Sequence, residues 1–141
     1  MRHLDMTAVV LDLPKIIFAA PKSSERVTFE ANDFFAQESV QKADLYLSRM
    51  IFHNWGDKYY SQILQNLISA LRKGSRIAIN DHVIPSPGVL SPYKDWTTRV
   101  VDLVMKEYFN AKERDISVWI KLLKKADGRC EIRNVIRLEG S

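Results

Sequence analysis

The sequence predicts an α/β domain built on a mainly parallel sheet. Short, almost continuous apolar runs, typical of buried parallel strands, alternate along the chain with longer stretches whose apolar residues recur at helical spacing. The chain has 141 residues, of which 46% are hydrophobic, which is enough for the core of one domain and too little for two. We therefore expect residues 1–141 to form a single α/β domain.

Five segments have the composition of strands. The first reads TAVVLDL and ends before Pro14, so it is apolar along nearly its whole length. The last alternates polar and apolar residues, which is typical of a strand with two different faces. The expected strands cover residues 7–13, 26–29, 43–51, 76–80 and 130–138.

Four segments are expected to be helical. Residues 14–20 begin with Pro14, which suits the first position of a helix. Residues 58–72 carry apolar side chains at helical spacing, and Gly74 stands where a capping glycine would end that helix. The remaining helices are expected over residues 96–110 and 117–126.

The composition favours a cytoplasmic protein with neither nucleic-acid nor membrane partners. The net charge is +4, but basic and acidic residues are interleaved, and the basic cluster at residues 121–125 has the pattern of a solvated helix face. Asp5, Asp12 and Lys15 interrupt the N-terminal apolar run, so we expect no signal peptide. No stretch approaches the roughly 20 apolar residues of a membrane span. The single cysteine, Cys130, cannot form an internal disulfide, which fits a reducing compartment.

Polar side chains follow the predicted strands, where open α/β sheets bind their ligands. Asp12, Asp33, His53 and Asp81 all occupy such positions. A carboxylate at Asp12 can accept both hydroxyls of a ribose, although capping of the next helix is the more common role for such a residue. His53 is suited to taking a proton near neutral pH, and a purely structural role is equally open.

Two further carboxylates could orient the His53 imidazole. Asp81 or Glu113 could accept its second N–H and so fix the tautomer. A surface charge near a helix N-terminus is the alternative for Glu113. The sequence shows no metal-ligand spacing, nucleophile elbow or phosphate loop.

The ordered segments resemble the C-terminal catalytic domain of the S-adenosylmethionine-dependent O-methyltransferases of plants and fungi. The resemblance runs from about Thr7 to the C-terminus, and the phrases FHNW and NDHVIP favour the fungal branch, with its many enzymes of secondary metabolism. It implies a partial Rossmann-like class I methyltransferase domain with S-adenosylmethionine as cofactor. The segments that carry the resemblance are VVLDLPKII, VTFEANDFF, ADLYLSRMIFHNWGDKYYSQILQNLISALRKGSRIAINDHVIP and DLVMKEYFNAKERDISVWIKLLKKAD.

The resemblance implies a role for four residues in cofactor binding. Asp12 matches the acid that binds the ribose. Asp33 and Phe34 match the pair that holds the adenine. Arg49 stands where the plant enzymes usually have a lysine near the cofactor, so the positive charge is kept but the geometry is not equivalent.

The resemblance also implies a catalytic set. His53 matches the base that removes a proton from a phenol or another hydroxyl of a small, phenolic or polyketide-like substrate. Asp81 and Glu113 match the two acids that flank this base, although plant relatives have a glutamate at the first position. Trp55 and Met105 lie where the family builds its substrate pocket, and core packing is an equally open reading of both. No metal is implied.

Some parts of the family pattern have no counterpart here. Relatives carry a Gly-rich strand, turn and helix before the VVLDLP strand, whereas residues 1–6 contain no glycine. The N-terminal dimerisation region and the last strand are also expected to be missing. In the family's sheet that first strand lies between the Asp12 strand and the strand before His53. We therefore expect two hydrophobic strand edges either to stay unpaired or to pair with each other.

Four interpretations follow from the missing parts. The chain is an incomplete copy of an active methyltransferase, or it is complemented by another chain that supplies the strand. Alternatively, it is a non-catalytic partner of an intact relative, or its fold serves a chemistry other than methyl transfer. Homodimerisation is a further expectation.

Overall fold

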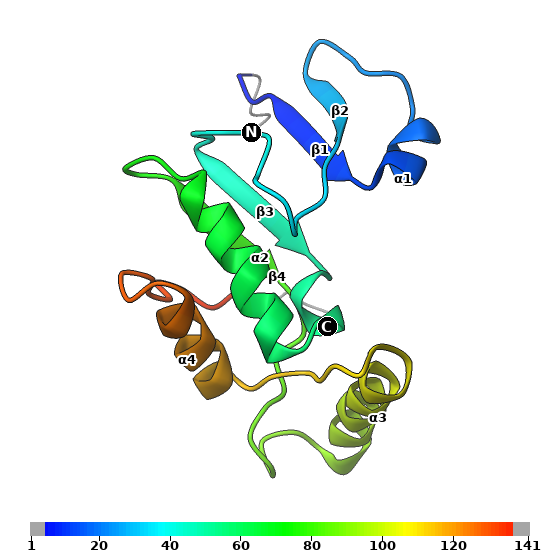
Figure 1. The fold of residues 1–141 in the computed structure, drawn as a ribbon. Coiled ribbons are helices and arrows are strands. Elements are labelled where there is room, and N and C mark those ends of the chain that lie inside the picture. Colours follow the sequence, from blue (N-terminus) through cyan, green and yellow to red (C-terminus); the bar gives the residue numbers. More distant parts are fainter. Residues whose placement is uncertain (1–4, 137–141) are drawn as a thin grey trace.

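The computed structural model describes residues 5–136. In this part of the chain, two small parallel sheets are combined with four α-helices (Figure 1). Strand β1 (Ala8–Asp12) pairs with β2 (Val27–Ala31), and β3 (Leu45–Arg49) pairs with β4 (Arg76–Asn80). The predicted α/β class with parallel strands is confirmed. Of the two outcomes expected for the strand edges, the described residues show separate pairs and not one joined sheet.

Each sheet is a βαβ unit, in which a helix carries the chain back to a parallel strand. Helix α1 (Pro14–Phe18) connects β1 to β2 and has Pro14 in its first turn. Helix α2 (Asp57–Ser69) connects β3 to β4. The prediction that this helix runs to residue 72 and is capped by Gly74 was wrong. It ends at Ser69, and Gly74 (φ +95°) lies in the following turn, where its backbone conformation requires a glycine.

The hydrophobic core lies between α2 and helix α4 (Ile116–Ala126), which run side by side (Figure 1). Both helices present an apolar face, as their sequence spacing predicts. Ile77 and Ile79 of β4 pack against this cluster and connect it to the second sheet. The buried residues of the core are Phe52, Tyr60, Ile63, Leu64, Trp119, Leu122 and Leu123.

Helix α3 (Pro92–Phe109) lies apart from the core helices (Figure 1). None of its residues is buried, and it contacts the short 3-10 helix η1 (Phe52–Asn54). The helix ends at Phe109 and is capped by Asn110, whose left-handed conformation (φ 49°) turns the chain back toward the core. None of the helices in residues 5–136 is both long enough and apolar enough to span a bilayer.

The strand predicted over residues 130–138 is not found in the described part of the chain. Residues 130–136 form no strand, and 137–138 lie outside the described residues. Cys130 and Ile132 are partly buried against the core, whereas Val135 and Ile136 are exposed, so the apolar pattern predicts burial only at the start of the segment. A strand also needs a neighbour for its backbone N–H and C=O groups, and β4 is paired with β3 alone among the described strands.

Candidate active site

A left-handed residue sends the chain from β3 into η1. Met50 has φ 53°, a conformation that costs a residue with a side chain on the order of 1 kcal/mol. The Met50 N–H donates to the Asn80 carbonyl of β4 at 2.9 Å. The Met50 carbonyl accepts a hydrogen bond from the Asn54 side chain at 3.2 Å. The turn places His53 in η1 with 5% of its surface exposed.

Glu113 holds the His53 imidazole. Glu113 Oε1 lies 2.9 Å from His53 Nδ1, and both side chains are buried. The backbone of Glu113 is anchored as well, because its N–H donates to Asp102 Oδ1 of α3 at 2.8 Å, while the second carboxylate oxygen, Oε2, is buried without a partner among the described residues. With Nδ1 engaged, Nε2 is the ring nitrogen that can exchange a proton with another molecule.

Asp81 follows β4 and lies close to the same imidazole. Its Oδ2 accepts the Phe52 N–H at 3.1 Å, and its Oδ1 is buried without a partner among the described residues. Burial raises the pKa of Asp81 to about 6, against the opposing influence of His53. His82 lies next to this group, with its ring centroid 6.0 Å from that of His53. The structure therefore brings His53, Asp81 and Glu113 together, as the sequence predicts.

The candidate cofactor residues lie at the carboxyl ends of the strands. Asp12 is exposed at the end of β1, and its Oδ1 accepts the Leu13 N–H at 2.7 Å. Leu13 is the N-cap of α1, so Asp12 does not occupy the capping position. Asp33 is exposed after β2, where its Oδ1 accepts the Phe35 N–H at 2.9 Å, and Arg49 is exposed at the end of β3. Exposed carboxylates at strand ends suit the hydroxyl groups of a ribose.

Phe34 and Trp55 join the two βαβ units. Phe34 follows β2 and Trp55 follows β3, and their ring centroids lie 5.8 Å apart. Phe35 contacts both rings, at 5.0 Å from Phe34 and 4.7 Å from Trp55. Phe34, Phe35 and Trp55 also pack against the core, so Trp55 has a packing role in the structure. Met105 lies half-buried on a separate element, α3.

Two residues next to the site were not predicted. Asp102 holds Glu113 in place, and Arg114 is buried beside η1 with 2% of its surface exposed. Burial alone would raise the pKa of Asp57, the carboxylate partner of Arg114, but hydrogen bonding and the charges of Arg114 and Lys112 lower it overall. In the sequence, the one feature that could have pointed to Arg114 as a residue of the site is its position directly after Glu113. Among residues 5–136, no cluster of three or more His, Cys, Asp or Glu side chains could hold a metal ion.

Comparisons with known proteins fit this arrangement. The O-methyltransferase domain model matches residues 2–128. O-methyltransferase aoiF of Aspergillus oryzae is 36% identical over 99% of this chain and 36% of its own length. The chlorophenol O-methyltransferase of Trichoderma longibrachiatum is 37% identical over 98% of this chain and 31% of its own length. LepI, solved in complex with SAM, superposes with a TM-score of 0.75 at 29% identity, over 85% of this chain and 30% of LepI.

This chain spans about a third of the length of these relatives. The match nevertheless includes both βαβ units and the segment that carries Glu113. The chain belongs to the O-methyltransferase domain family.

Proposed function

We propose that this chain carries the base and part of the cofactor site of an S-adenosylmethionine-dependent O-methyltransferase of secondary metabolism. The observation that carries the proposal is the buried His53–Glu113 pair, 2.9 Å apart, at the carboxyl end of a parallel sheet. A histidine oriented in this way is suited to general-base catalysis, because its free nitrogen has a fixed direction.

S-adenosylmethionine is the cofactor that the family and the LepI complex indicate. The exposed Asp12 carboxylate would hold its ribose, and Asp33 with Phe34 would hold its adenine. Arg49 would lie near it as a positive charge. When bound, the cofactor would supply an electrophilic methyl group, whose bond to the positively charged sulfur breaks as the acceptor oxygen bonds to the methyl carbon, so that the sulfur leaves as an uncharged thioether.

The protein's part in the reaction is proton removal and positioning. His53 takes the proton of the acceptor hydroxyl at Nε2, since Nδ1 is held by Glu113. Glu113 and the nearby Asp81 favour the imidazolium that results, because their charge is opposite to it. Holding the hydroxyl against this base turns an encounter in solution into a step within one complex.

We propose a phenolic or polyketide-like hydroxyl compound as the acceptor. A relative that matches nearly the whole of this chain methylates a chlorophenol, as its name states. We propose that the side chains of Trp55 and Met105 contact the bound acceptor.

The test separates cofactor binding from chemistry. Calorimetric titration with S-adenosylmethionine and a methyl-transfer assay with a chlorinated phenol are run on the parent chain, His53→Ala and Asp12→Ala. We expect His53→Ala to bind the cofactor like the parent chain and to lose methyl transfer by about 10²- to 10⁴-fold. Asp12→Ala should weaken cofactor binding. Equal turnover of His53→Ala and the parent chain would contradict the assignment of the base.

A second function, as an interaction module, is favoured by the exposed apolar side chains of the two small sheets. Parallel sheets are normally covered on both faces, whereas here each has two strands and exposed apolar residues. In this role the chain would be a non-catalytic partner that pairs with a second copy, with a complementing chain or with a full-length methyltransferase. The exposed residues on the strands are Val9, Val10, Leu45 and Leu47.

Light scattering at micromolar concentration tests the second function. Self-association, or association with an added intact fungal O-methyltransferase, would support an interaction module. Asp substitutions at Val10 and Leu47 should abolish that association. A monomer that unfolds cooperatively and ignores the added enzyme would count against it.

A further inference from the structure

The most deeply buried charge among the described residues has no part in the reaction outlined above. Arg114 exposes 2% of its surface, and its side chain is fully enclosed. Its planar group lies near two aromatic rings of the core, 5.3 Å from the Tyr60 centroid and 5.9 Å from the Trp119 centroid. Burial of a guanidinium is costly unless its donors are satisfied, so the groups that receive its hydrogen bonds indicate its role.

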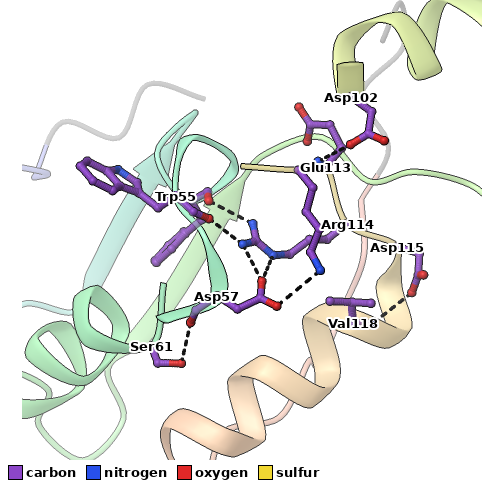
Figure 2. Close-up of polar contacts among 10 residues, drawn as sticks. Trp55, Asp57, Ser61, Asp102, Glu113, Arg114, Asp115 and Val118 are labelled. Atoms are coloured by element: carbon purple, nitrogen blue, oxygen red, sulfur yellow. Dashed lines mark hydrogen bonds and ion pairs between the residues drawn. The ribbon is translucent and has the colours of Figure 1, made fainter. Parts of the chain in front are cut away.

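Arg114 binds the backbone on both sides of His53. Its Nη1 donates to the Phe52 carbonyl at 3.0 Å. Its Nη2 donates to the Trp55 carbonyl at 2.6 Å (Figure 2). Phe52 directly precedes His53, and Trp55 ends the 3-10 turn that contains it. The two carbonyls are therefore held at a fixed separation by one rigid group.

Asp57 fixes the guanidinium from the other side. Its Oδ1 accepts hydrogen bonds from Arg114 Nε at 3.2 Å and Nη2 at 2.9 Å (Figure 2). Asp57 is the first residue of α2, so its position is set by the helix that forms the core. Lys112 Nζ lies 3.4 Å from the other oxygen, Oδ2, and contacts the same carboxylate from the exposed side.

Consecutive residues thus hold both parts of the candidate base. Glu113 binds the imidazole ring of His53, and Arg114 binds the backbone that carries it. We propose that Arg114 is a positioning residue that sets where His53 Nε2 meets the acceptor hydroxyl. The proposal rests on the proposed function, in which His53 is the base.

Replacement of Arg114 by lysine separates the effect of the positive charge from the effect of the planar guanidinium. Lysine keeps the positive charge and the pairing with Asp57, but its single ammonium cannot hold two carbonyls and a carboxylate in one plane. Arg114→Lys therefore removes the fork while leaving the charge. Two control variants are matched to it. Lys112→Met removes the other cation on Asp57, and Leu122→Ala weakens the core without touching the carbonyls of η1.

The experiment measures the position of His53 directly and through catalysis. NMR of the imidazole nitrogens, assigned with a His53→Gln variant, gives the exchange rate of the ring proton shared with Glu113. The methyl-transfer assay gives kcat and KM, and thermal unfolding gives the stability of each variant. We expect Arg114→Lys to speed this exchange and to lower kcat by about 10- to 100-fold with KM nearly unchanged. Lys112→Met should leave the exchange rate, kcat and KM at the parent values.

Leu122→Ala shows whether the effect is merely structural. We expect it to lower the unfolding temperature without speeding the exchange of the His53 ring proton. An exchange rate in Arg114→Lys that equals the parent rate, or that rises no more than in Leu122→Ala, would overturn the positioning role. If the parent chain transfers no methyl group, that result counts against the proposed function, and the NMR comparison still decides whether Arg114 positions His53.

Discussion

The chain contains two βαβ units whose strands pair alike but whose packing differs. In the first, β1, α1 and β2 contain no buried residue, and Phe18 is 94% exposed. In the second, α2 buries Tyr60 and Leu64 completely against α4. Helix length explains much of the difference, because α1 has 5 residues and α2 has 13, so only α2 presents a long apolar face.

The difference separates the two halves of the candidate site. His53, Asp81 and Glu113 belong to the packed unit and its neighbours, where burial holds their geometry. Asp12 and Asp33 follow the strands of the open unit and are exposed. The candidate base is therefore formed by this chain's own core, whereas Asp12 and Asp33 depend on a unit that contains no buried residue.

The largest expected effect tests the packing difference directly. Leu64→Ala removes a fully buried side chain and should lower the free energy of unfolding by about 2 to 5 kcal/mol. Val10→Ala in β1, where Val10 is 41% exposed, should cost about 1 kcal/mol or less. Urea unfolding measures both. Similar losses would mean that the first unit has a core of its own in solution.

A smaller effect concerns the buried carboxylate of the packed unit. The folded protein raises the pKa of Asp81 from 3.8 to about 6, so it binds this proton more tightly than the unfolded chain does. The resulting stabilisation is fully present below about pH 4 and is lost as the pH rises through 6, and it amounts to at most about 3 kcal/mol. Asp81→Asn should flatten this part of the stability profile.

Asp12→Asn is the matched control for the pH experiment. Asp12 ends β1 as Asp81 follows β4, but it is exposed. Unfolding at a series of pH values between 4 and 8 should give the parent profile for Asp12→Asn. The same flattening in both variants would show that the slope does not come from burial at Asp81.

The smallest effect concerns a helix cap. The Asp115 side chain accepts the N–H groups of Ser117 and Val118 at the start of α4, at 2.7 and 3.0 Å. Asp115→Ala should cost about 1 kcal/mol, and Asp115→Asn, which can also cap, should cost less. Thermal unfolding measures both. The N-cap of α1, Leu13, makes no such side-chain bond, so Leu13→Ala is expected to change stability less than Asp115→Ala.

The sequence alone determined the alternation of strands and helices, because periodicity and turn residues are local properties. It also offered His53 with Asp81 or Glu113 as candidates for the site, and the family resemblance of the ordered segments implied all three. Its local signals failed at Gly74 and in residues 130–136. The helix ends before that glycine, and the second segment has an apolar pattern but no strand to pair with in the described structure.

Only the tertiary structure decided which candidates meet and what holds them. His53 and Glu113 are 60 residues apart in sequence, and the Arg114 contacts with Phe52 and Trp55 span similar distances. Nothing local marks Arg114 as buried, because charged residues are usually exposed unless a partner compensates them. That partner comes from α2, so the role of Arg114 is visible only once α2, η1 and the start of α4 pack together.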